Sequence, residues 1–109
     1  MEAENETNEK IARLQMLEQN MQTLLMQKQQ YQSQLFELES ALTEIEKSQT
    51  AYKIVGGIMV SSTKEELKKE LGQKKEIVEL RLGSIDKQEK QFREKAKVLQ
   101  EELIGSLKK

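Results

Sequence analysis

Hydrophobic residues in the first half of the chain recur at alternating spacings of three and four. The ten positions are Leu14, Leu17, Met21, Leu24, Lys28, Tyr31, Leu35, Leu38, Leu42 and Ile45, and nine of them are apolar. This is the a/d repeat of a coiled coil. It predicts a long helix over residues 7–48, with Asn5 or Thr7 as the N-terminal cap.

The second half has a weaker repeat with the same period. Leu71, Val78, Ile85, Phe92 and Leu99 are spaced by seven, and they alternate with Lys75, Leu82, Glu89, Ala96 and Leu103. The segment Thr63-Lys64-Glu65-Glu66 has the form of a capping box. We therefore expect a second helix over residues 63–107. Gly72 and Gly83 lie inside it, and each should weaken it by roughly 1 kcal/mol relative to alanine.

The two repeats fit one antiparallel pairing. The residue numbers of Leu14 and Leu99, and of Leu42 and Leu71, both add up to 113, and so do those of several pairs between them. The point of reversal then lies between Gly56 and Gly57. Because the repeats were identified independently, their agreement predicts an intramolecular hairpin of two helices. It argues against a parallel dimer, in which each seam would pair with its own copy.

Lys28 and Glu89 are polar residues at seam positions of this pairing, about one helical turn apart. Two interpretations stay open. They form an interhelical ion pair that fixes the alignment, or, as is more common, both side chains extend to water.

The segment between the helices has the pattern of a β-hairpin over residues 52–61. Two β-prone runs flank Gly56-Gly57, and glycine accepts the positive φ that a type I′ or II′ turn requires. The predicted cross-strand pairs are Val55 with Ile58, Ile54 with Met59, Lys53 with Val60 and Tyr52 with Ser61. Both faces of this ribbon carry apolar side chains.

A lone two-stranded ribbon is only marginally stable in water, and unpaired apolar edges favour association. We therefore expect the hairpin to pair with other subunits. The residues predicted for this contact are Tyr52, Ile54, Val55, Gly56, Gly57, Ile58, Met59 and Val60. The simpler alternative is an elaborate turn that joins the helices, although such a turn needs only a few residues.

Several apolar residues lie off the seams. Ile11 and Met16 on the first helix, and Val98, Ile104 and Leu107 on the second, gather at the open end of the helical hairpin. Loose apolar surfaces that contain methionine suit binding to varied partners. The alternative is that these residues widen the seam or cover one another.

Composition excludes several functional classes. Charged residues make up 34% of the chain and aromatic residues 4%, with no proline, cysteine or histidine, and the formal charge is −1. This is the make-up of long helices, and it contains no basic surface for nucleic acid. Without His, Cys or a phosphate-binding loop, we expect no enzyme activity, no metal and no cofactor. No apolar run is long enough to span a membrane, and the acidic start is unlike a signal peptide.

The chain resembles the β-type subunits of prefoldin, closest to the archaeal form. The residues that carry the resemblance are Tyr52-Lys53, Val55-Gly56, Ile58 and Val60 in the hairpin, Leu80-Arg81, Ile85 and Lys87-Gln88-Glu89 in the second helix, and Gln27-Lys28-Gln29, Ala41-Leu42 and Glu44-Ile45 in the first. The short connection 46–51 and the helical Gly72 and Gly83 depart from the family pattern. The short C-terminus after Leu107 fits the archaeal type.

This resemblance implies an ATP-independent cytoplasmic chaperone (a holdase) that works in a hexamer of two α-type and four β-type subunits. Family members capture non-native polypeptides at the coiled-coil tips and pass them to a group II chaperonin. The residues expected to bind unfolded polypeptides are Ile11, Leu14, Met16, Leu17, Val98, Leu103, Ile104 and Leu107. The sequence thus predicts one all-α domain over residues 1–109. The alternative function is a scaffolding coiled coil that oligomerises through its β-hairpin and binds no client.

Overall fold

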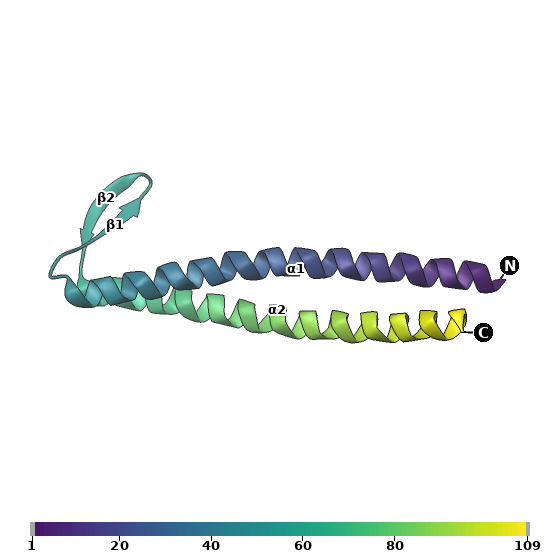
Figure 1. The fold of residues 1–109 in the computed structure, drawn as a ribbon. Coiled ribbons are helices and arrows are strands. Elements are labelled where there is room, and N and C mark those ends of the chain that lie inside the picture. Colours follow the sequence, from purple (N-terminus) through teal and green to yellow (C-terminus); the bar gives the residue numbers. More distant parts are fainter. Residues whose placement is uncertain (1, 109) are drawn as a thin grey trace. The chain divides into compact units, whose positions relative to one another are not determined.

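The structure, a computed structural model, describes residues 2–108 as two long helices with a β-hairpin between them (Figure 1). The elements in chain order are α1 (Glu2–Lys47), β1 (Ala51–Val55), β2 (Ile58–Ser62) and α2 (Lys64–Leu107). The predicted fold class is confirmed.

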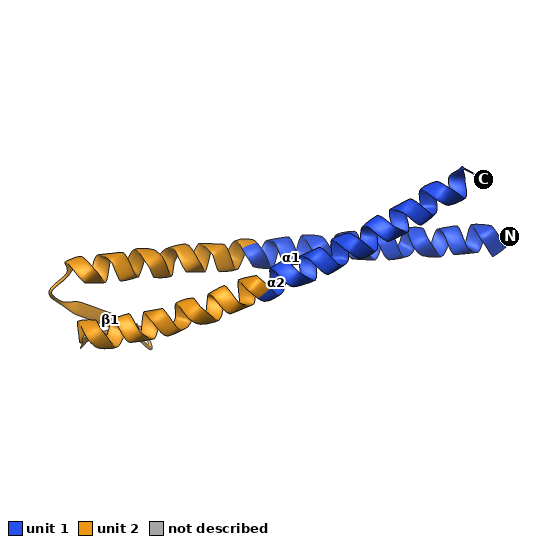
Figure 2. Ribbon diagram, turned by 90° about the horizontal axis from the view of Figure 1, so that it is seen from below, with its two compact units in different colours: residues 1–28, 84–109 blue, residues 29–83 orange. Residues whose placement is uncertain are grey.

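The chain divides into two compact units, each containing a segment of both helices (Figure 2). The terminal unit consists of Met1–Lys28 and Ser84–Lys109, and the hairpin unit is Gln29–Gly83. The single domain over residues 1–109 stays a prediction.

Helix α1 begins at Glu2, five residues before its predicted start. The expected caps, Asn5 and Thr7, lie inside the helix, and the Thr7 hydroxyl donates to the Ala3 carbonyl at 2.8 Å. Both capping predictions were wrong. Glu2 and Glu4 explain the earlier start, because carboxylates in the first turn interact favourably with the positive end of the helix dipole.

The start of α2 has half of the predicted capping box. The Glu66 amide donates to the Thr63 hydroxyl at 3.2 Å, so Thr63 is the N-terminal cap. The Glu66 carboxylate accepts a hydrogen bond from the Ser62 hydroxyl at 3.4 Å. The helix proper therefore begins at Lys64, one residue after its predicted start.

The core of each unit is the predicted seam. All ten seam positions of each helix are buried or half-buried. Leu24, Ile85 and Ala96 are buried in the terminal unit, as are Leu67 and Val78 in the hairpin unit. Leu67 lies off the predicted seam, and it lines a cavity beside β1.

Polar contacts between the helices follow the predicted antiparallel pairing within each unit. In the terminal unit, Lys10 Nζ lies 3.3 Å from Glu102 Oε2. In the hairpin unit, the Arg81 guanidinium donates to the Tyr31 hydroxyl at 3.1 Å and lies over its ring. Each pair falls within one helical turn of the predicted alignment, so the alignment is confirmed inside both units.

Candidate functional site

The β-hairpin turns at Gly56 and Gly57, whose φ angles are +57° and +80°. Positive φ at both central residues is the signature of a type I′ turn, which leaves the two strands in register. The strands pair as predicted, from Val55 opposite Ile58 to Tyr52 opposite Ser61, and Ala51 opposite Ser62 extends the ladder.

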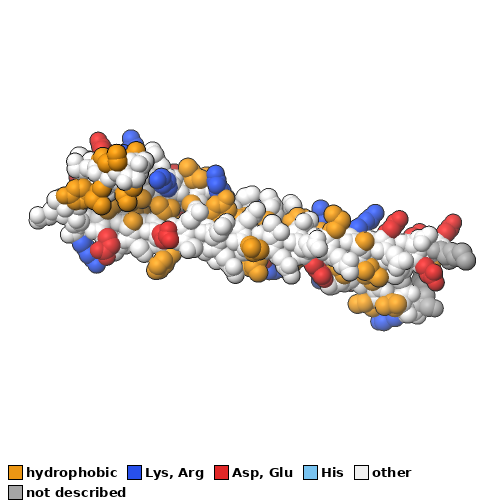
Figure 3. Space-filling view, turned by 90° about the horizontal axis from the view of Figure 1, so that it is seen from above, with side chains coloured by type: hydrophobic (Ala, Val, Ile, Leu, Met, Phe, Trp, Pro, Cys, Tyr) orange, Lys and Arg blue, Asp and Glu red, His pale blue; other side chains and the backbone are white. Residues whose placement is uncertain are grey.

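The apolar side chains of the hairpin are exposed on both faces. Tyr52, Ile54 and Met59 share one face and are 57%, 72% and 66% exposed. On the other face, Val55 and Ile58 are exposed, while Lys53 forms an ion pair with Glu70 of α2 at 3.4 Å. Figure 3 shows hydrophobic side chains gathered over this part of the surface. The helices of the hairpin unit therefore do not bury the ribbon.

Charged residues join the end of α1 to the start of α2 beside the hairpin. Lys64 Nζ donates to the Glu46 carbonyl at 2.9 Å, which satisfies a carbonyl that the helix end leaves free. Lys68 forms an ion pair with the Glu46 carboxylate. This hydrogen-bonded lysine holds the pKa of Glu46 below its ordinary value.

Lys28 forms an interhelical ion pair in the terminal unit, which settles the alternative that the sequence left open. Its Nζ lies 3.2 Å from Asp86 and 3.5 Å from Glu89. Hydrogen bonding and charge attraction from Asp86, followed by the charge of Glu89, raise the pKa of Lys28. Arg93 in turn forms an ion pair with Glu89 one turn further along α2.

The predicted client-binding residues lie in the terminal unit and differ in exposure. Leu14, Leu17 and Leu103 are half-buried seam residues. The other five are exposed: Ile11 (41%), Met16 (63%), Val98 (52%), Ile104 (53%) and Leu107 (81%). A large part of their apolar surface is therefore open to a ligand.

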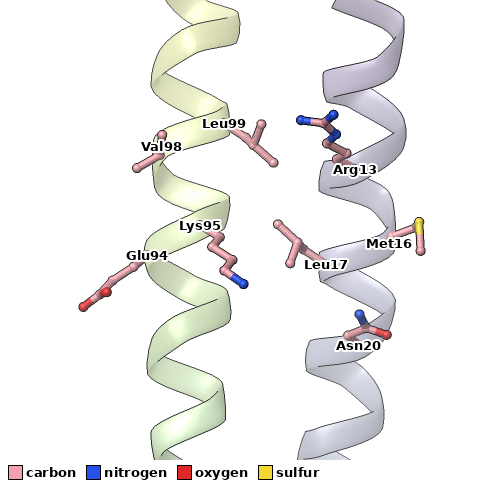
Figure 4. Close-up of a pocket in the computed structure, with 8 residues that line it drawn as sticks. All are labelled: Arg13, Met16, Leu17, Asn20, Glu94, Lys95, Val98 and Leu99. Atoms are coloured by element: carbon pink, nitrogen blue, oxygen red, sulfur yellow. The ribbon is translucent and has the colours of Figure 1, made fainter.

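A groove of about 530 Å³ brings three of these residues together (Figure 4). It is lined by Arg13, Met16, Leu17 and Asn20 of α1 and by Glu94, Lys95, Val98 and Leu99 of α2. Leu17 and Leu99 point toward the space between the helices. The structure does not place Ile11, Leu14, Leu103, Ile104 or Leu107 in the lining of this groove.

Heptad positions explain this division. With Leu14 as position a of the first helix and Leu99 as position d of the second, Met16 and Val98 both occupy c positions. In an antiparallel pair the g positions of the two helices lie on the same side of the seam, and each c position lies next to them. Ile11 and Leu107 occupy e positions, which flank the other side. Residues that the sequence grouped as one cluster thus belong to two sides of the coiled coil.

Sequence reasoning missed the polar residues of the groove. Arg13, Asn20 and Lys95 all occupy g positions, and Leu99 was identified only as a seam residue. The heptad count contained the signal, because antiparallel pairing places g positions of the two helices on the same side.

Within residues 2–108, no group of three or more His, Cys, Asp or Glu side chains is placed to hold a metal ion. None of the described helices combines the length and apolar character needed to cross a membrane.

Comparison with known proteins identifies the family. The sequence model of the prefoldin subunit family matches residues 8–109. The chain belongs to the prefoldin family. It is 37% identical over 101 residues to the prefoldin subunit beta of Pyrococcus furiosus, and the alignment covers 90% of this chain and 86% of that relative. It is also 37% identical over 100 residues to the prefoldin subunit beta of Archaeoglobus fulgidus, and that alignment covers 89% of this chain and 86% of the relative.

A solved structure has the same fold. The crystal structure of the prefoldin beta subunit from Thermococcus strain KS-1 aligns with a TM-score of 0.90 at 34% identity. The alignment covers 95% of this chain and 94% of that one. The resemblance to the archaeal β type is thus confirmed.

Membership of the prefoldin family defines the function in outline. Prefoldins are chaperones and not a family of enzymes, so the prediction of a chaperone subunit is confirmed. Prefoldin subunits form hetero-oligomeric complexes, and the expectation of an assembly is confirmed at that level.

Proposed function

We propose that this chain is a holdase subunit that captures non-native polypeptides at the free ends of its helices. The observation that supports this most directly is the apolar groove of the terminal unit, beside which Met16 and Val98 are both more than half exposed. Apolar side chains left open to water suit contacts with unfolded chains, which expose the same kind of surface. Ile11, Ile104 and Leu107 expose further apolar surface in the terminal unit, outside this groove.

Capture by several weak contacts needs no ATP, since release follows from the low affinity of each contact. Several arms in one assembly raise the overall affinity by multivalency. We propose the assembly that the resemblance implies: two α-type and four β-type subunits, with transfer of the client to a group II chaperonin. The absence of cysteine is compatible with the cytoplasmic location that we expect.

The test is suppression of aggregation of an unfolding protein by the assembled complex. We expect the paired substitutions Met16→Ser and Val98→Ser to reduce protection strongly, because they remove exposed apolar surface from the groove. The matched control is Met26→Ser with Leu80→Ser, which removes apolar side chains that are 69% and 75% exposed but lie outside the groove.

Equal protection by both variants would contradict capture at the groove. Removal of residues 1–16 and 98–109 tests the whole end: the truncated chain should lose protection and keep the same number of subunits in its assembly. Full protection by that truncated chain would favour the scaffolding alternative for this end of the chain, with any client held elsewhere in the complex.

A further inference from the structure

Two basic residues of the groove have no acidic partner within the described part of the chain. Neither Arg13 nor Lys95 forms an ion pair with any residue between 2 and 108, whereas three other basic residues of the terminal unit do: Lys10 with Glu102, Lys28 with Asp86 and Arg93 with Glu89. Lys90 and Lys97, which are exposed and lie outside the groove, likewise form no ion pair with the described residues, so what distinguishes Arg13 and Lys95 is their place in the lining of the groove.

The directions of the side chains add to this contrast. In Figure 4, Arg13 extends from α1 toward α2, and Lys95 extends from α2 toward α1. Glu94, the one acidic residue of the lining, points away from α1. Both cations therefore point into the same space between the helices as the apolar side chains of Leu17 and Leu99.

We propose that this groove selects segments of non-native polypeptides in which apolar side chains are flanked by aspartate or glutamate. This inference rests on the proposed holdase function and gives its ligand a chemical class. The apolar side chains of the segment would contact Met16, Leu17, Val98 and Leu99. Its carboxylates would pair with Lys95 and with Arg13, whose guanidinium can bind a carboxylate through two hydrogen bonds.

The overall charge of the chain makes this selection testable. The net charge is −1, so the chain as a whole does not attract acidic ligands. A preference for acidic segments must then come from local charge. Segments flanked by lysine or arginine would meet two like charges at the groove.

The experiment uses two labelled, unstructured peptides that share one core of Leu and Phe and differ only in flanking Glu or Lys residues. Their affinities for the unmodified 109-residue chain are measured by fluorescence anisotropy at low salt. We expect the Glu-flanked peptide to bind about three- to ten-fold more tightly, the range expected for two partly exposed ion pairs.

The double substitution Arg13→Gln and Lys95→Gln should abolish that difference while both peptides still bind through the apolar side chains of the groove. The control is Lys90→Gln with Lys97→Gln, which removes the same charge from helix positions outside the groove and should keep the preference. Glutamine is a good helix former, so both variants should retain their helices, as checked by circular dichroism.

Three outcomes would overturn the proposal. Equal binding of both peptides to the unmodified chain excludes charge selection, and a preference that survives Arg13→Gln with Lys95→Gln places it outside the groove. Failure of both peptides to bind, together with unchanged aggregation suppression after Met16→Ser and Val98→Ser, removes the proposed client site itself.

Discussion

Lys28 shows how one polar residue fits an apolar seam. The sequence offered Glu89 as a partner, and the structure adds Asp86, which lies nearer. Both carboxylates come from successive turns of the same face of α2. They raise the pKa of Lys28 above its ordinary value of 10.5, so this pair contributes stability at neutral pH and loses it as pH rises through the raised pKa. Polar pairs at seam positions are best known for fixing alignment.

Glu46, near the C-terminal end of α1, gives the stability the opposite pH dependence. Its pKa is held below 4.5 chiefly by Lys68, so its contribution is present above that value and lost as pH falls through the lowered pKa. We expect Glu46→Gln to lower the midpoint of thermal unfolding at pH 7, and the difference from the unmodified chain to vanish in strong acid. Calorimetry from pH 7 to strong acid measures the midpoints of thermal unfolding of the variant and of the unmodified chain.

Glu44 is a suitable control, because it lies on the same helix and forms no ion pair with residues 2–108. Glu44→Gln should leave the pH dependence unchanged. A Glu46→Gln difference that persisted below the lowered pKa would show that the charge of Glu46 is not its cause.

Thr63 caps α2 through a single hydroxyl. Thr63→Ala removes the hydrogen bond to the Glu66 amide and should destabilise the chain by about 1 kcal/mol. Urea denaturation measures the change. Ser61→Ala, a hydroxyl deletion in β2 outside the cap, should have a much smaller effect; equal losses would argue against capping by Thr63.

At the scale of the element, the glycines divide into two kinds. Gly83 lies inside α2, and a Cβ added there would meet no atom within 4 Å. Gly83→Ala should therefore stabilise the chain by about 1 kcal/mol, the difference in helix propensity between the two residues. Gly57, with its φ of +80°, is the contrasting case: Gly57→Ala should destabilise by about 1–2 kcal/mol, the cost of a left-handed conformation.

Denaturant midpoints of the two variants should thus shift in opposite directions. A destabilising Gly83→Ala would show that helix propensity does not decide the effect of this residue on the stability of α2.

The helices and strands were largely predictable because the residue patterns that specify them are periodic. The heptad positions from Leu14 to Leu103 determined which residues are buried, and a two-residue glycine loop fixed the strand pairing. Two features that depend on the local surroundings of a residue, and not on the repeat, were missed. The start of α1 depends on carboxylates in its first turn, and the burial of Leu67 depends on its position beside the hairpin. The groove was found only in part, since Arg13 and Lys95 show their unpaired state only in three dimensions.

At the scale of the whole molecule, the exposed hairpin is the surface that we propose for contact with other subunits. Ile54→Lys with Met59→Lys places charge on its outward face, opposite each other in the ladder. We expect this variant to lose high-mass assemblies, as measured by native mass spectrometry with an α-type partner present, because charged residues block association of apolar β surfaces.

Tyr31→Phe is a matched control in the helices, since it removes only the hydroxyl that accepts from Arg81. Its assembly should be unchanged. Intact assemblies of the hairpin variant would assign subunit contact to the helices.

The two-stranded sheet has a further consequence for assembly. Within residues 2–108 each strand pairs only with the other, so the outer edge of β1 and that of β2 both remain open. In the language of polymer chemistry, such a chain is a bifunctional monomer. Bifunctional monomers that join edge to edge either close into a ring or grow without limit. The supply of a second kind of subunit that sets the curvature would then decide between a particle of fixed size and a filament.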